Sequence, residues 1–276
     1  MNTQKIKDKK KINKKIKIFI IIPVVIIVTV LFFLSPIFAV KNIVFINETD
    51  TSSKEEILNI LENVKGKNGF LYIYNNVSGI KNIDYFFSMR AKSIEDQITL
   101  SLPKLKKVKI KYDFPGTLSV SFGQRYPEYL IDVSGSYICA DIEGFIIDID
   151  INKDNSNLPI IKGLDITECK LGRQFQTENG EETVHSILKN IFNKTKLIDK
   201  ENNKLKLLER IEMIDIFDYN NIWMFLYGNV SVEIGKPDNL DHKITQLKEI
   251  LLSDEIVGKQ GHIDLKSPNP VFKEKQ

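Results

Sequence analysis

The sequence predicts an α+β protein that is held in a membrane by a single N-terminal transmembrane helix. An uncharged segment of 23 residues comes first, then a strand–helix–helix–strand–strand pattern, then a series of short strands with two amphipathic helices. We expect the distal part to be an antiparallel sheet with helices on one face. The predicted boundaries are a tail at 1–17, a transmembrane helix at 18–40, a first domain at 41–127, a distal β domain at 128–272 and a C-terminal tail at 273–276.

The transmembrane helix is predicted from the length of the uncharged segment Ile18–Val40. At roughly 1.5 Å of rise per residue it spans roughly 35 Å, more than the roughly 30 Å hydrocarbon core of a bilayer. A buried core helix and a cleaved signal peptide are the alternatives. The apolar region of a signal peptide is only about 7–15 residues long. Ile37 and Phe38 are also bulky where cleavage needs small side chains, so we expect an uncleaved anchor.

The tail predicts the orientation of the chain in the membrane. Its 17 residues carry eight lysines and one aspartate, a charge of +7. Such charge stays on the cytoplasmic side, so the N-terminus is expected in the cytoplasm and the domains outside the cell membrane. Removing the tail's +7 from the chain's +3 leaves −4 for the rest. The basic charge therefore predicts contact with the lipid bilayer, and no nucleic acid partner is expected.

The first domain begins with a predicted strand at Ile43–Ile46, directly after the span. Ser53–Glu56 has the pattern of a capping box, which predicts a helix beginning there and ending just before Gly66. A second helix is predicted from Ser93 to the residue before Pro103.

Two alternating strands complete the predicted first domain. Lys107–Tyr112 alternates strictly between lysine and apolar residues, the turn Phe114–Gly116 follows, and Leu118–Phe122 alternates again. The lysine row, Lys107, Lys109 and Lys111, has two interpretations. It is either a solvated face that protects an edge strand from aggregation, or a second edge that docks a partner.

The segment Leu71–Lys92, between the two helices, is long for a loop in a compact domain. It is expected to carry an extra short helix or to be a surface insertion. Its aromatic residues could contact lipid headgroups or a partner, or pack over the domain. They are Tyr72, Tyr74, Tyr85, Phe86 and Phe87.

The distal domain is predicted as seven strands and two helices, with a further extended piece at Leu158–Ile161. The last strand, His262–Lys266, is short and is followed by two prolines, which suits the edge of a sheet. The other strands are Tyr129–Ile131, Tyr137–Cys139, Phe145–Ile147, Ile211–Phe217, Ile222–Tyr227 and Val230–Ile234, and the helices are Asn179–Ile198 and Leu240–Leu251.

Residue patterns typical of catalysis are missing, so we expect no enzyme, no catalytic residue, no metal and no cofactor. His185, His242 and His262 do not have metal-ligand spacing, and no hydrolase motif is present. Cys139 and Cys169 either form a disulfide or remain two free thiols.

One acidic run, Asp148–Asp154, resembles the start of a calcium-binding loop. Lys153 stands where that loop needs glycine, and Pro159 stands where it needs a bidentate glutamate. The alternation of acidic residues with isoleucine is better interpreted as the polar face of a strand.

Taken together, the motifs resemble the FtsQ/DivIB family of bacterial cell-division proteins over nearly the whole chain. Each piece is weak alone, but their order behind a single anchor is specific. The pieces are Val40–Asn47, Leu102–Ile110, Phe114–Val120, Gln124–Pro127, Leu158–Gly163, and Lys243–Leu251 followed by Ile263–Lys266.

The resemblance implies a membrane-proximal POTRA-type domain of βααββ order, a distal β domain and a scaffold role at the division septum. Its implied partners are bitopic proteins of the FtsL and FtsB/DivIC type, bound by pairing with an edge strand, and no small-molecule substrate is implied. The residues implied to bind the partner are Ile263, Asp264, Leu265, Lys266, Ser267, Val271 and Phe272. Alternatively, that strand is paired within the sheet and the contact lies elsewhere.

Two functions of other classes compete with the scaffold. One is a membrane-anchored cell-wall hydrolase or transferase whose site is assembled from scattered residues, and it requires a cleft with convergent titratable groups. The other is a module for polypeptide transport or folding, which would also act by strand addition.

Overall fold

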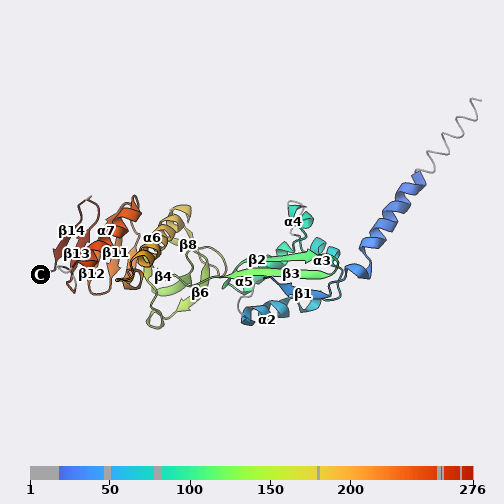
Figure 1. Ribbon diagram of the computed structural model, residues 1–276, viewed down its shortest axis with the longest axis horizontal. Coiled ribbons are helices and arrows are strands. Elements are labelled where there is room, and N and C mark those ends of the chain that lie inside the picture. The colour runs from blue at the N-terminus through green and yellow to red at the C-terminus, as the bar shows by residue number, and fades with distance from the viewer. Residues whose placement is uncertain are drawn as a thin grey trace, which may run out of the picture. The chain divides into compact units, whose positions relative to one another are not determined.

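The computed structural model describes residues 19–46, 51–77, 83–178, 181–253, 256, 258–267 and 269–275 (Figure 1). The chain divides into two compact units, which are described separately below. The first takes the chain up to Thr99 together with Lys106–Gly123, and the second takes Leu100–Leu105 together with the chain from Gln124. The boundary predicted at residue 127 lies within the second unit.

An apolar helix precedes the first folded domain. Phe19–Phe38 forms 20 residues of helix, and among the described residues it is the one helix long and apolar enough to cross a membrane. It ends in the 3-10 turn η1 (Pro36–Phe38), where the Ser35 hydroxyl accepts a hydrogen bond from the Ile37 amide. The basic tail and Ile18 lie outside the described residues, so the orientation predicted from the tail stays a prediction.

The first unit is built on a three-stranded sheet in the order β1-β3-β2. The strands are β1 (Asn42–Phe45), β2 (Leu105–Asp113) and β3 (Thr117–Gln124), and β1 is parallel to β3. The helices are α2 (Thr51–Ile60), η2 (Glu62–Val64), α3 (Gly69–Asn75), α4 (Ile83–Phe87) and α5 (Lys92–Ser101). Ile57, Ile98, Ile110 and Leu118 are fully buried, as the apolar stripes and alternating strands predict.

Two details of the first unit differ from the sequence prediction or extend it. Helix α2 already includes Thr51, so Ser53 is a helical residue and the predicted capping box does not stand at the helix start. The segment Leu71–Lys92 contains α4 and most of α3, which confirms the extra short helix. Its aromatic residues differ in burial: Tyr72 is buried, whereas Tyr74 and Phe87 are exposed.

The second unit contains a nine-stranded sheet in the order β14-β13-β12-β11-β10-β7-β4-β5-β6. It is mixed and not wholly antiparallel, because β7 pairs in parallel with β4 and β10, and β12 pairs in parallel with β13. The strands are β4 (Tyr129–Val133), β5 (Ser136–Ala140), β6 (Ile146–Ile151), β7 (Ile160–Lys162), β10 (Ile211–Asp215), β11 (Ile222–Leu226), β12 (Val230–Gly235), β13 (Gly261–Asp264) and β14 (Val271–Glu274).

Helices and smaller elements accompany this sheet. The long helices are α6 (Glu181–Glu201) and α7 (Leu240–Leu252), and the predicted cap residue Asn179 lies outside the described residues. The smaller elements are the 3-10 turns η4 (Lys153–Asn155) and η5 (Leu208–Arg210) and a two-stranded sheet of β8 (Ile166–Glu168) and β9 (Gln176–Thr177).

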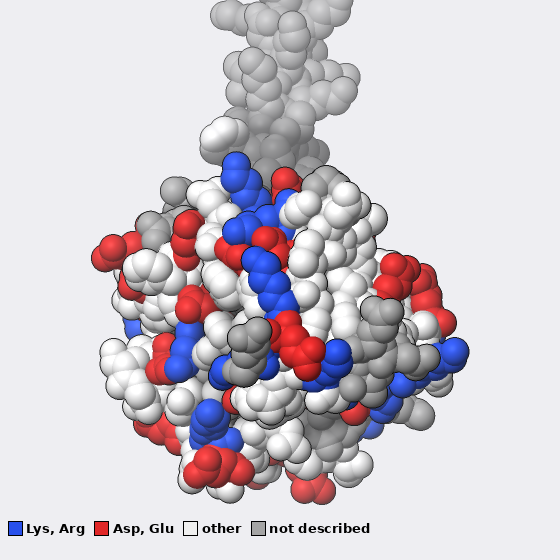
Figure 2. Space-filling model, turned by 90° about the vertical axis from the view of Figure 1, so that its left-hand side faces the viewer, with Lys and Arg blue, Asp and Glu red and all other residues white. Residues whose placement is uncertain are grey.

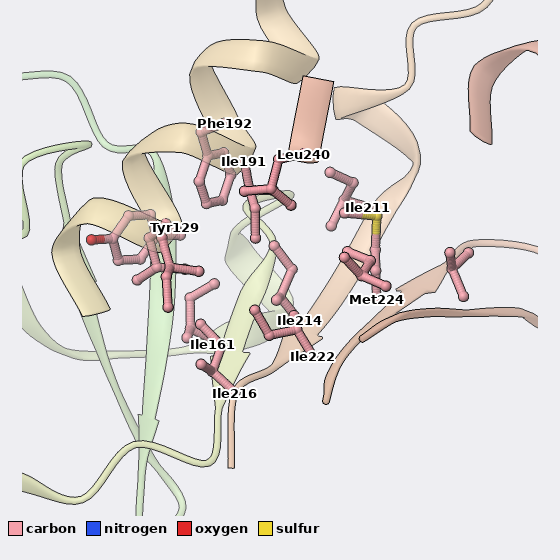
Figure 3. Packing of buried hydrophobic residues seen from close by; sticks show 14 of the residues in the cluster. Tyr129, Ile161, Ile191, Phe192, Ile211, Ile214, Ile216, Ile222, Met224 and Leu240 are labelled. Carbon is pink, nitrogen blue, oxygen red and sulfur yellow. The ribbon is translucent and has the colours of Figure 1, made fainter. Parts of the chain in front are cut away.

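The main core lies between α6, α7 and one face of the nine-stranded sheet (Figure 3). Tyr129 on β4 stacks on Phe192 of α6 with ring centroids 5.3 Å apart. Fully burying a large apolar side chain stabilises a fold by roughly 1.5–3 kcal/mol. Because neighbouring residues of a strand point to opposite faces, Leu130, Cys139 and Ile160 form a smaller apolar cluster on the other face.

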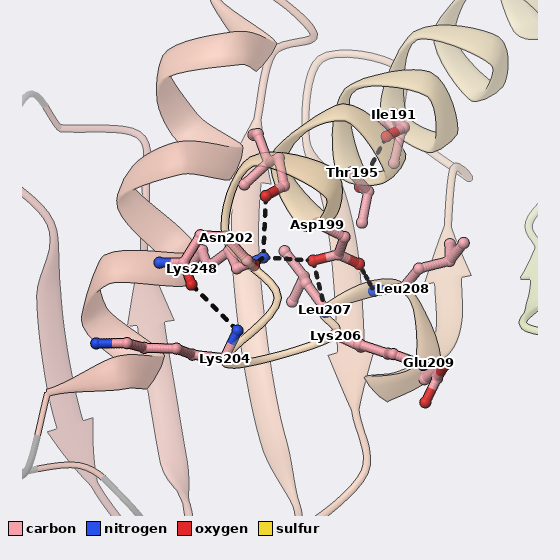
Figure 4. Close-up of polar contacts among 11 residues, drawn as sticks. Ile191, Thr195, Asp199, Asn202, Lys204, Lys206, Leu207, Leu208, Glu209 and Lys248 are labelled. Atoms are coloured by element: carbon pink, nitrogen blue, oxygen red, sulfur yellow. Dashed lines mark hydrogen bonds and ion pairs between the residues drawn. The ribbon is translucent and has the colours of Figure 1, made fainter.

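Two buried ion pairs fix the second unit. Arg125 is stacked on the Phe145 ring at 3.6 Å, and its guanidinium lies 2.5 Å from an Asp141 carboxylate oxygen. The second pair joins the helices, because Lys248 of α7 donates to Asp199 of α6 at 2.6 Å (Figure 4). Lys248 also donates to the backbone carbonyls of Ile198 and Asn202, so it caps the carboxyl end of α6.

Candidate partner-binding edge

Strand β14 is the outermost strand at one end of the nine-stranded sheet. It lies beside β13, which lies in turn beside β12 (Figure 1). An outer strand has backbone groups on one side that no strand of its own sheet pairs, so a strand from another chain can extend the sheet there. The partner-binding candidate is therefore the β14 edge.

The sequence prediction placed this edge one strand too early. Ile263 pairs with Val232 of β12 on one side and with Phe272 of β14 on the other. Asp264 is likewise paired on both sides, with Glu233 and Val271. The interpretation of His262–Lys266 as the edge strand is therefore wrong, because a hairpin adds one more strand outside it.

The remaining predicted binding residues lie after β13 or on β14. Leu265, Lys266 and Ser267 follow β13, and Leu265 is buried with 2% of its surface exposed. A charge at Leu265 would therefore disrupt the core before it tested any interface. Val271 and Phe272, predicted as anchors after the prolines, lie on β14 itself.

The pairing register shows which backbone groups of β14 point outward. The amide of Lys275 donates to the carbonyl of Gln260 at 2.9 Å, so this position faces β13. Antiparallel residues alternate between facing the partner strand and facing away from it. The amides and carbonyls of Phe272 and Glu274 therefore point away from β13, toward any incoming strand.

The side chains of β14 differ from one another in exposure, polarity and charge. Val271 is exposed over 50% of its surface, whereas Phe272 packs partly against the main core. Lys273 and Glu274 are exposed. Figure 2 views this end of the molecule, and Lys, Arg, Asp and Glu are interspersed on it. Recognition there would therefore depend on strand pairing and individual residues more than on a field of one sign.

Gly261 allows β14 to lie close to β13. A Cβ atom at this position would lie 2.3 Å from the carbonyl oxygen of Lys273 and 2.8 Å from the ring of Phe272. Both distances are shorter than any real contact, so only glycine fits.

Ion pairs hold the same hairpin. Lys266 donates to Glu233 of β12 at 2.8 Å, which raises the pKa of Lys266. Lys259 pairs with Glu274 at 3.0 Å. The Lys259–Glu274 pair is exposed and contributes little stability, whereas Glu233 is buried on its side of the other pair.

A hollow of about 480 Å³ lies beside the edge, lined in part by Phe225, Ser231, His262 and Lys273. Nδ1 of His262 is 3.2 Å from the Ser231 hydroxyl, and the His262 ring is tilted against the Trp223 ring with centroids 5.4 Å apart. Within the described ranges, no group of three His, Cys, Asp or Glu residues is placed to hold a metal ion.

The other residues singled out in the sequence lie away from the edge. Cys139 is buried and Cys169 is exposed, and both are free thiols. Burial raises the pKa of Cys139 to about 11, which keeps this thiol protonated and unreactive near neutral pH. His185 contacts the Phe175 carbonyl, and His242 is exposed on α7.

The lysine row lies on β2, the outer strand of the first unit's sheet. Lys107, Lys109 and Lys111 are all exposed. Part of this edge is covered, because the amide of Ala91 donates to Ile110 and the amide of Tyr112 donates to Met89. The second docking edge stays a prediction, and it concerns the part of β2 near Lys107 and Lys109.

Comparisons with known proteins support the resemblance to the FtsQ/DivIB family. The family model described as "POTRA domain, FtsQ-type" matches residues 73–121. A cell division protein DivIB of Clostridium acetobutylicum is 26% identical over 84% of this chain and 82% of its own length. A cell division protein DivIB of Clostridium tetani is 28% identical over 86% of this chain and 79% of its own length. The chain is thus similar to the FtsQ/DivIB family, in the POTRA domain by the family model and over most of its length by the two DivIB proteins.

Proposed function

We propose that this chain is a single-pass scaffold of the cell-division machinery that binds partner division proteins through the β14 edge. The division role follows from its family, whose relatives are cell division proteins. The observation that carries the binding mode is the position of β14 as the outermost strand. The proposed partners are bitopic proteins of the FtsL and FtsB/DivIC type.

The mechanism of binding would be strand addition. An incoming strand pairs with the outward amides and carbonyls of Phe272 and Glu274, which supplies affinity without a deep pocket. Val271 offers an apolar contact and Lys273 a charge, so the partner strand should carry an apolar residue and an acidic residue on the matching face. These side chains would set specificity.

Membrane anchoring would make a weak strand contact effective. Confining the chain and its partners to one bilayer raises their effective concentration, as a linker does. We place the tail in the cytoplasm and the two units outside, at the septum, on the basis of the eight lysines before the span. No step of this mechanism requires a reaction by the chain itself.

The outward amide of Glu274 gives a direct test. Glu274→Pro removes that amide hydrogen but no pairing bond to β13, because this residue faces away from β13. Glu274→Ala is the matched control, because it loses the carboxylate and its pair with Lys259 but keeps the amide. Full-length variants are co-expressed with tagged FtsL- and DivIC-type partners and purified in detergent.

We expect Glu274→Pro to lose most of the captured partner and Glu274→Ala to retain it. Equal capture by both variants would show that the partner binds elsewhere. Loss in both would assign binding to the Glu274 side chain and reject strand addition.

A further inference from the structure

Five aromatic rings meet where the apolar helix joins the first unit, and we call them the aromatic collar: Phe33, Phe38, Phe70, Tyr112 and Phe114. The rings come from the helix end, from α3 and from the end of β2 with its turn. Phe70 lies at the centre, 4.9 Å from both Phe33 and Phe114 and 5.2 Å from Phe38 between ring centroids. Most pairs are edge-to-face, the favourable arrangement for aromatic rings.

Hydrogen bonds tie the helix end to this unit. The Asn68 side chain accepts from the Leu71 amide, capping α3, and donates to the carbonyl of Phe33 at 2.9 Å. The Tyr112 hydroxyl donates to the carbonyl of Phe38 at 3.0 Å. A helix carbonyl that would otherwise lack a partner is thus satisfied by the folded domain.

Apolar side chains at the aromatic collar and next to it remain exposed to solvent. Phe114 and Ile37 are each 55% exposed, and Phe33 is 41% exposed. Leu71 on α3 adds a further apolar residue that is 45% exposed. An apolar patch of this kind on an aqueous domain marks an interaction surface.

Lysines stand next to the collar. The Val40 amide donates to the carbonyl of Lys67, and the Lys41 amide donates to Gly116 in the turn after Phe114. Lys41, Lys65 and Lys67 are all exposed. Apolar surface with flanking lysines suits the boundary between lipid tails and headgroups, where lysine stems cover apolar surface and their charges reach phosphate.

We infer that the aromatic collar seats the first unit on the surface of the same bilayer that its helix crosses. The occupant is lipid, because the patch is continuous with the apolar helix Phe19–Phe38 through Phe33. Phe114 and Ile37 enter the layer between tails and headgroups, and the lysines contact phosphate groups. The membrane thus holds the domain at two places, the span and the collar, independently of any partner at β14.

Tryptophan fluorescence in lipid tests this inference. Trp223 is the single tryptophan of the chain, so Trp223→Phe gives a silent background. In this background the reporters are Phe114→Trp in the collar and Phe87→Trp on α4, where the native side chain is 73% exposed. The full chain is reconstituted into phosphatidylcholine vesicles with anionic lipid, with or without bromine atoms on the upper part of the acyl chains.

We expect brominated lipid to reduce the emission of the collar reporter by more than half and to leave the α4 reporter nearly unchanged. Leu71→Trp, on α3 beside the collar and outside the span, serves as a second collar reporter if Phe114→Trp does not fold. Collar reporters quenched no more than the α4 reporter would overturn the inference. Equal strong quenching at all positions would also overturn it, because contact would then not be specific to the collar.

Discussion

The guanidinium of Arg125 lies 2.5 Å from the carboxylate of Asp141, and the two side chains are only 4% and 5% exposed. Arg125 also donates to the carbonyl of Leu105 at 3.2 Å, and Asp141 accepts from the amides of Glu143 and Phe145. Both charges are thus paired, and each makes further hydrogen bonds to backbone groups, which is the condition under which burying them is tolerated.

Removing Arg125 should destabilise the second unit strongly. Arg125→Ala leaves the Asp141 charge buried without its partner, which costs roughly 3–5 kcal/mol. Urea unfolding of the detergent-solubilised chain measures this loss. The control Arg173→Ala removes an exposed arginine and should change stability by no more than about 0.5 kcal/mol. A loss below about 1 kcal/mol for Arg125→Ala would mean that Asp141 finds water in place of the arginine.

Removing Lys248 should open the carboxyl end of α6. Lys248→Ala leaves Asp199 and two helix carbonyls without their ammonium, so hydrogen exchange at 198–202 should accelerate. The control Lys194→Ala breaks the pair with Asp241, whose side chain is 69% exposed, and should leave that exchange unchanged. Unchanged protection in Lys248→Ala would show that packing alone holds the helix end.

A side chain at Gly261 should displace β14 without unfolding the unit. Gly261→Ala places a Cβ against the Lys273 carbonyl, which is backbone and cannot swing aside. In Gly123→Ala the nearest atom is 3.2 Å away on the flexible Lys106 side chain, so it is the control. We expect faster exchange of β14 amides and weaker partner capture in Gly261→Ala only. Normal exchange with lost capture would mean that Gly261 itself touches the partner.

The two cysteines should differ in reactivity with a thiol reagent. Burial raises the pKa of Cys139 from 9.0 to about 11, so the native thiolate population is minimal at pH 8. Cys169 is exposed and should be the residue that iodoacetamide modifies, with Cys139 reacting only after denaturation. Mass spectrometry of the labelled chain decides this, and rapid native labelling of Cys139 would contradict its burial.

The same pKa shift predicts a small dependence of stability on pH. Because the folded pKa of Cys139 lies above the unfolded value, its contribution is complete below pH 9.0 and is lost as the pH rises toward about 11. Cys139→Ala should flatten the fall in stability over that interval. Parallel curves for both proteins would exclude Cys139 as the cause.

The sequence predicts most elements because their patterns are local. The alternation of Lys107–Tyr112 and the stripe of Leu240, Ile244 and Leu247 each have one periodicity, and the structure contains β2 and α7 at those places. The parallel pairings could not be predicted, since alternation shows which face is buried but not the direction of the neighbouring strand.

Strand β14 is not predicted from the sequence because it is short and largely exposed. It has four residues, follows Pro270, and buries little apart from part of Phe272, so its short pattern resembles a tail. Its position is set by long-range pairing with β13 and by the space left at Gly261. The sequence therefore predicts Val271 and Phe272 as anchors near the edge but predicts β13, not β14, as the edge strand.

The parallel pairing of β12 with β13 determines which segments must be in place beside the proposed docking edge. Parallel neighbours cannot be joined by a tight turn, so α7 must cross the sheet before β13 can be added, and β14 follows β13. The proposed docking edge therefore depends on the placement of α7 and β13, neither of which supplies its outward backbone groups.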